Sequence, residues 1–169
     1  MLRILLLICI ASVFACVPGC SSGNGLPPDA TIALQEATSF ELLSLDPGQS
    51  QNPDRRDSQT EADRLHGWIV LGTTAIQDSN TRATLVSRFA AGVAEHNGMV
   101  ASCFNPRHAI KLIHDGKTHV FVICFECAQV EWYIDGQETN GFLIAVSPQP
   151  MFDEVLQKAN VPLAEKSKH

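Results

Sequence analysis

Residues 118–127 read THVFVICFEC, and the uncharged middle of this stretch determines the expected fold. Five consecutive residues, Val120 to Cys124, carry no charge. An apolar run of this length, without alternation between apolar and polar positions, is typical of a strand that is buried on both faces. We therefore expect Val120–Cys124 to form the central strand of a sheet that other parts of the chain cover on each side.

Turn signals and apolar runs on both sides of this stretch predict an antiparallel sheet around it. Asp115-Gly116 is typical of a hairpin turn and pairs the central strand with the segment before it. Asp135-Gly136 ends the strand after it in the same way. Six further segments are predicted as strands: SFELLSL (39–45), HGWIVLGTTAI (66–76), MVASCF (99–104), AIKLIH (109–114), QVEWYI (129–134) and GFLIAV (141–146).

Two segments have helical periodicity. TRATLVSRFAAGVAEHNG (81–98) follows good N-cap residues at 78–80 and places Leu85, Phe89 and Val93 on one face, which we expect to pack on the sheet. SPQPMFDEVLQKANVPLA (147–164) opens a short terminal helix with a proline in its first turn. The predicted fold class is α+β: a single antiparallel sheet of about five to seven strands, with one long helix packed on it and a short C-terminal helix.

A chain of 169 residues with 45% hydrophobic residues has room for one domain with a substantial core. The composition along the chain changes at five places, and each change predicts a boundary. The predicted organisation is a signal peptide (1–19), a flexible tether (20–35), a single α+β domain (36–164) with a polar loop or insertion (46–63), and a tail (165–169).

The N-terminus predicts export. Met1-Leu2-Arg3 gives a positive end, and the apolar run after it is too short to span a bilayer. The next residues, VPGCSSG, resemble a bacterial lipobox in which Cys20 is acylated and becomes the first residue of the mature chain. Cys16, in VFAC, is a rival for lipidation, and an ordinary secretory signal is a further alternative. Ser21 lacks the aspartate that retains lipoproteins in the inner membrane, so we expect an outer-membrane or periplasmic location.

The charge of the chain bears on its partners. The full chain has 12 Lys+Arg and 18 Asp+Glu residues, a formal charge of −6. This balance argues against a nucleic-acid partner, because such a partner requires a basic surface. An acidic domain also lacks the polybasic patch that binds anionic lipids, so we expect membrane attachment through the acyl anchor at Cys20. The sequence does not indicate a protein or small-molecule partner.

CFNPRH (103–108) and CFEC (124–127) form a cluster of three cysteines and a histidine. Once Cys20 is acylated, an odd number of thiols remains, so they cannot all pair within one molecule. A disulfide from Cys103 to Cys124 or Cys127 would join neighbouring strands, and buried thiols that pack as small apolar groups are the plain alternative. Cys103, His108, Cys124 and Cys127 could also complete a tetrahedral zinc shell, although no cofactor is assigned.

A redox pair within CFEC is the least favoured interpretation. If the strand continued through the motif, the Cα atoms of Cys124 and Cys127 would lie about 10 Å apart, too far for a disulfide. Arg107 is a candidate anion-binding residue, with a salt bridge to Glu126 or Glu131 as the simpler alternative. No catalytic residue is assigned, and the sequence favours a non-enzyme.

Five segments together resemble a known group: SLDP, HGWIVLG, CFNPRHAI, VICFECAQV and SPQPMFDEVLQKANVPLA. They are similar to segments of predicted lipoproteins of planctomycete-type bacteria for which no activity is established, and the similarity covers most of residues 40–164. The resemblance implies export and a single domain, and it assigns no catalytic residue. The expected function is thus a lipid-anchored extracytoplasmic domain that binds or scaffolds at the cell envelope. The alternative is a metal-binding or thiol-redox protein that uses the two cysteine motifs.

Overall fold

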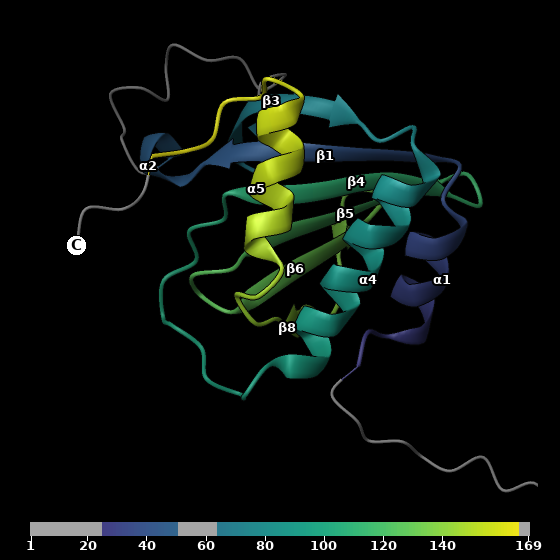
Figure 1. Ribbon diagram of the computed structural model, residues 1–169. Helices are drawn as coiled ribbons and strands as arrows, with labels where there is room; N and C mark the ends of the chain where they lie inside the picture. The colour runs from purple at the N-terminus through teal and green to yellow at the C-terminus, as the bar shows by residue number, and fades with distance from the viewer. Residues whose placement is uncertain (1–24, 51–63, 166–169) are drawn as a thin grey trace, which may run out of the picture.

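The structure is a computed structural model that describes residues 25–50 and 64–165 (Figure 1). The predicted signal peptide with Cys16, residues 20–24 of the tether with Cys20, residues 51–63 of the polar loop and residues 166–169 of the tail lie outside the described residues. Within the described residues, no helix is both long and apolar enough to cross a membrane.

The predicted α+β class with one antiparallel sheet is confirmed. The described residues form one sheet of eight strands, more than the five to seven expected, in the order β2-β3-β1-β4-β5-β6-β7, with β8 also pairing with β6. Every pairing is antiparallel. The strands are β1 (Ser39–Asp46), β2 (Arg64–Leu65), β3 (Trp68–Ala75), β4 (His108–His114), β5 (Lys117–Cys124), β6 (Gln129–Ile134), β7 (Gln137–Glu138) and β8 (Phe142–Leu143).

The predicted central strand occupies an interior position in this sheet. Val120–Cys124 lies in β5, between β4 and β6, and all five of its residues are buried. Because strand side chains alternate between faces, Phe121 and Ile123 point to one face while Val120 and Val122 point to the other. Both faces are therefore covered, as the uncharged sequence predicts.

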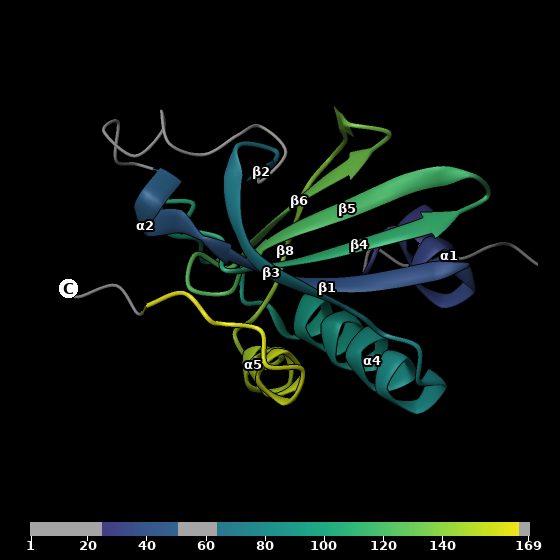
Figure 2. The ribbon, with the colours of Figure 1, turned by 90° about the horizontal axis from the view of Figure 1, so that it is seen from above.

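Helices cover one face of the sheet. The helices are α1 (Pro28–Glu36), the single turn α2 (Pro47–Ser50), α4 (Ser79–Glu95) and α5 (Gln149–Lys158). Figures 1 and 2 show α4 and α5 on one side of the sheet, with α1 beside α4. Leu85, Phe89 and Val93 of α4 are buried in the core on this side, together with Phe121 and Ile123 of β5. Asp78 caps α4 by accepting a hydrogen bond of 2.7 Å from the backbone N–H of Thr81.

The prediction of a flexible tether at 20–35 is wrong for its second half, because α1 is a packed helix. Pro28 stands in its first turn, where a proline costs no helical hydrogen bond. Ala30, Ala33 and Leu34 recur at helical spacing and are completely buried in the helix-side core. The small size of the alanines makes this apolar face weak in sequence, although it lets the helix lie close to its neighbours.

Two predicted strands also differ from the structure. Residues 99–104 form no strand, and the chain enters the sheet only at His108. GFLIAV contributes only Phe142–Leu143, in β8. In HGWIVLGTTAI, His66 and Gly67 have positive φ angles of 49° and 85° and form the turn between β2 and β3. The expected strand therefore begins only after this turn, as β3 (Trp68–Ala75).

The other face of the sheet is covered by the sheet itself. Figure 2 shows the sheet curling away from α4 and α5, so that β2 and β6 rise on the same side. The ring of His66, after β2, stacks on that of Tyr133 in β6 with a centroid separation of 3.6 Å. Beneath these edges lies a second apolar cluster, formed by Leu43, Leu45, Ala109, Val120 and Val122, with Leu65, Trp68, Val70, Phe104 and Tyr133 packed against it.

His119 of β5 is a buried titratable group on the helix side of the sheet. Its side chain is 5% exposed, and burial is the main cause that lowers its pKa below the ordinary value of 6.5. The charges of His114 and Lys117 lower the pKa further, while those of Asp135 and Asp29 oppose the shift. The pKa of His119 is therefore lower in the folded chain than in the unfolded chain. As the pH falls through 6.5, the unfolded chain binds more protons than the folded chain does.

We therefore expect the free energy of unfolding to decrease between about pH 7.5 and pH 5.5, partly because of His119. His119→Phe preserves a ring that can stack on Trp132, whose centroid lies 5.9 Å away, but it removes the titrating group. Urea unfolding at several pH values should therefore give a smaller decrease for the variant than for the wild-type chain. Equal decreases in the two proteins would contradict this assignment.

Candidate functional site

The CFEC motif forms a disulfide-closed turn between β5 and β6. Cys124 and Cys127 are bonded, with their Cα atoms 5.2 Å apart, so the pair that the sequence favoured least is the one that forms. Residues 125–128 are a turn, in which the N–H of Ala128 donates to the carbonyl of Phe125. Ala128 has a positive φ of 59° and redirects the chain into β6. Glycine or asparagine usually occupies such a position, so the alanine here is no turn signal.

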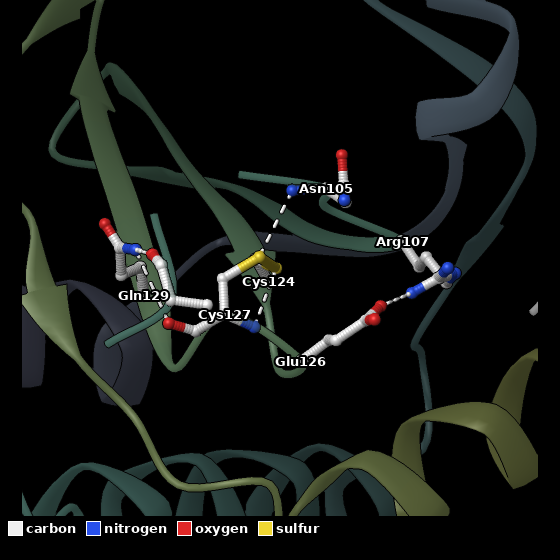
Figure 3. Close-up of a disulfide and its surroundings, with 7 residues drawn as sticks. Asn105, Arg107, Cys124, Glu126, Cys127 and Gln129 are labelled. Carbon is white, nitrogen blue, oxygen red and sulfur yellow. Dashed lines mark hydrogen bonds and ion pairs between the residues drawn. A yellow bond between two sulfur atoms is a disulfide. The ribbon is translucent and has the colours of Figure 1, made fainter. Parts of the chain in front are cut away.

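Cys103 is exposed and carries a free thiol, so the predicted disulfide from Cys103 to Cys124 or Cys127 is wrong. The loop that contains Cys103 nevertheless lies against the disulfide-closed turn (Figure 3). The backbone N–H of Asn105 donates to Sγ of Cys127 at 3.2 Å. The backbone N–H of Ala101 donates to the carbonyl of Cys127 at 3.3 Å. The side chain of Gln129 in turn donates to the carbonyl of Ala101. CFNPRH and CFEC thus meet directly through the hydrogen bond from Asn105 to Cys127.

His108 is buried, and its side chain is directed to α5. Its Nε2 lies 2.8 Å from Oδ1 of Asp153, and the side chain of His108 is only 2% exposed. The rings of Phe125 and Phe152 meet it edge-on, with centroids 5.3 and 6.0 Å away. Asp153 was not among the predicted site residues. The sequence gives no signal for this pair, because the two residues come from elements far apart in the chain.

The predicted zinc shell is not assembled in this structure. Cys124 and Cys127 are bonded to each other, so neither is a thiolate that could bind zinc. Nor do the described parts of the chain, 25–50 and 64–165, bring together three or more His, Cys, Asp or Glu side chains in a way that could hold a metal ion.

Arg107 forms an ion pair with Glu126 in the disulfide-closed turn. Nη1 of Arg107 lies 2.6 Å from Oε2 of Glu126, and Figure 3 shows the two side chains directed at each other. Glu126 was one of the two partners expected for Arg107. The other, Glu131, instead accepts a hydrogen bond of 2.8 Å from the hydroxyl of Tyr133 on the other face of the sheet. Burial raises the pKa of Glu131.

A cavity of about 370 Å³ brings the Arg107–Glu126 and His108–Asp153 pairs together. Its wall is formed by the ends of β4 and β5, the start of α5 and the chain after α5. The lining residues are Arg107, His108, Glu126, Val146, Gln149, Asp153, Leu163 and Ala164. Positive, negative and amide groups therefore surround a volume that fits a small polar ligand.

The Ser, His and Asp residue types of a hydrolase triad meet beside this pocket. Ser44 is directly opposite His108 in the pairing of β1 with β4, and His108 contacts Asp153. However, Ser44 is completely buried, and its hydroxyl has no hydrogen-bond partner among the described residues. A nucleophile must reach the substrate and be bonded to its base, so this arrangement does not support hydrolysis.

The fold and the site define an α+β domain whose curled antiparallel sheet carries a polar pocket beside a disulfide-closed turn. A scan of protein-family models finds no match to this chain, and searches of the curated proteins and of the solved structures find none either.

Proposed function

We propose that this chain is an exported domain, anchored to a membrane by acylated Cys20, that binds a ligand without catalysis at the cell envelope. The observation that carries the proposal is the disulfide between Cys124 and Cys127. Such bonds form and persist in oxidising compartments outside the cytoplasm. The lipobox-like VPGC and the similarity of CFNPRH and CFEC to motifs of predicted planctomycete-type lipoproteins support the same conclusion.

The pocket supports binding in preference to catalysis. Its lining residues include no serine, threonine or cysteine that could act as a nucleophile. Both of its carboxylates are already engaged, Glu126 with Arg107 and Asp153 with His108. Groups that are held in such pairs are fixed in orientation, which suits recognition of a polar ligand.

Cys20→Ala is expected to release the chain from membranes or to stall its processing, because the acyl chains have no other attachment point in this proposal. The measurement is partitioning of the expressed full chain between detergent and aqueous phases, with Cys16→Ala as the matched control. The control should partition as the wild-type chain does. Unchanged partitioning of Cys20→Ala would indicate that Cys16 is acylated or that no lipid is attached. For the wild-type chain, separated membranes should show more protein in the outer membrane than in the inner one.

Thiol–disulfide exchange is a second candidate function. The disulfide across CFEC favours it, as does the free thiol of Cys103 in the adjoining loop. Against it, Cys124 is 1% and Cys127 0% exposed, and the motif lies in a turn and not at a helix N-terminus, where thiol pKa values are lowered. Exchange with dithiothreitol while the chain stays folded would favour this candidate. Resistance to the reagent under native conditions would favour a structural disulfide.

A further inference from the structure

The loop between α4 and β4 has a composition unlike the rest of this acidic chain. Residues 96–106, HNGMVASCFNP, contain no Asp, Glu, Lys or Arg. Met99 is 71% and Val100 54% exposed, which places them among the few large apolar side chains that this domain leaves in solvent. Single exposed apolar residues are common on protein surfaces, so the exposure alone assigns no role to them.

The loop is held in place by the disulfide-closed turn. Ala101, the residue after Val100, donates to the carbonyl of Cys127 and accepts from the side chain of Gln129. Asn105 contacts Sγ of Cys127 from the other end of the loop. Met99 and Val100 are therefore presented by a segment that is attached to the sheet on its C-terminal side and to α4 on its N-terminal side.

The position of this loop relative to the start of the domain indicates what it faces. Figure 1 shows α1 and α4 side by side and running in opposite directions, so that α1 begins at the end of the molecule where α4 ends. The described chain starts at Gly25, five residues after Cys20. Five residues span at most about 18 Å. An acyl anchor at Cys20 thus keeps this end of the domain close to the bilayer.

We propose that Met99 and Val100 dock on the lipid surface to which Cys20 anchors the chain, and that this contact orients the domain on the membrane. This inference depends on the proposed function. Because the anchor gives the loop a high effective concentration at the bilayer, two apolar side chains are sufficient for a weak contact. The absence of charged residues from 96–106 removes the cost of bringing a charge into the interface. The free thiol of Cys103 lies in the same loop and can carry a probe.

The test uses the full mature chain, acylated at Cys20, in phosphatidylcholine vesicles, with an environment-sensitive fluorophore on Cys103. A nitroxide quencher attached to the lipid headgroups should remove most of the emission from the wild-type chain. In Met99→Asp/Val100→Asp, quenching should fall by at least half, because the two carboxylates keep the loop in water. Ile113→Asp is the matched control: Ile113 is 40% exposed on β4, outside the loop, and this variant should be quenched as the wild-type chain is.

The outcomes separate the docking surface from the anchor. If the chain does not float with the vesicles, the acyl anchor is wrong and the docking inference fails with it. If it floats but all three proteins are quenched equally, the anchor stands and the docking surface is wrong. Quenching that changes with the density of protein on the vesicle would show that a second copy of the chain covers the loop, and this too would overturn the inference.

Discussion

Gly92→Ala is expected to lower the free energy of unfolding by about 2–3 kcal/mol, although alanine is the better helix former. A Cβ at this position of α4 would clash with Cγ of Pro148, and it would lie 2.9 Å from Cδ of Pro148 and 3.1 Å from Cγ1 of Ile144. The ring of Pro148 cannot rotate away as a flexible side chain would. The carbonyl of Gly92 also accepts a hydrogen bond of 2.8 Å from Ala145, which holds this segment against the helix.

The measurement is urea unfolding of the wild-type chain and the variant at one pH. Ser87→Ala is the matched control, because Ser87 is an exposed residue of the same helix, and we expect its effect to stay within about 0.5 kcal/mol. The usual gain from replacing a helical glycine by alanine is about 1 kcal/mol. A gain of that size at Gly92 would show that the segment before α5 moves freely and that the close packing is unimportant.

Gly92 also shows what the sequence can and cannot predict. A glycine inside an amphipathic helix indicates a close approach by another part of the chain, and the structure contains such an approach. Its partner is not the sheet but Pro148 and Ile144, in the connection between β8 and α5. Those residues lie far from Gly92 in the chain. No local pattern specifies which segment occupies the space that a missing side chain leaves.

Some of the strand predictions are right and others are wrong, for a similar reason. β4, β5 and β6 have apolar runs, and the Asp115-Gly116 turn joins β4 to β5, so the existence of these strands and the pairing of β4 with β5 follow from local sequence. The pairing of β5 with β6 depends on the turn at 125–128, which has no such signal. Residues 99–104 have a comparable apolar run but form no strand. The structure gives the reason, since β4 pairs with β1 on one side and β5 on the other, so no edge of β4 is left for residues 99–104. Instead, Phe104 packs on the second apolar cluster and Cys103 is exposed.

The candidate site was predictable only in part. Arg107 and Glu126 belong to the two motifs that the sequence singled out, and opposite charges at the ends of paired strands form an ion pair readily. Asp153 belongs to a helix whose position over the sheet follows from its buried face, formed by Phe152, Val155 and Leu156. Its contact with His108 therefore depends on the packing of the whole domain, and no spacing in the sequence reports it.

Removing the disulfide with Cys124→Ala/Cys127→Ala is expected to lower the free energy of unfolding by about 2 kcal/mol. A short closed loop restricts the unfolded chain little, so this value lies at the low end of the range for native disulfides. The loss should include the contact from Asn105 to Sγ of Cys127, which helps to hold the loop after α4. Urea unfolding of the non-reduced proteins measures the effect.

Dithiothreitol and an exposed cysteine supply the controls for this prediction. Complete reduction should destabilise the wild-type chain by a similar amount and leave the double variant unchanged, because only the wild-type chain has this bond to lose. Cys103→Ala removes an exposed thiol and should change the stability by less than about 0.5 kcal/mol. If Cys103→Ala proved as destabilising as the double variant, Cys103 would be part of the stabilising bond, and the pairing of Cys124 with Cys127 would be contradicted. Equal stability of the double variant and the wild-type chain would instead mean that the turn at 125–128 forms without its covalent closure, held by the strand pairing of β5 with β6 alone.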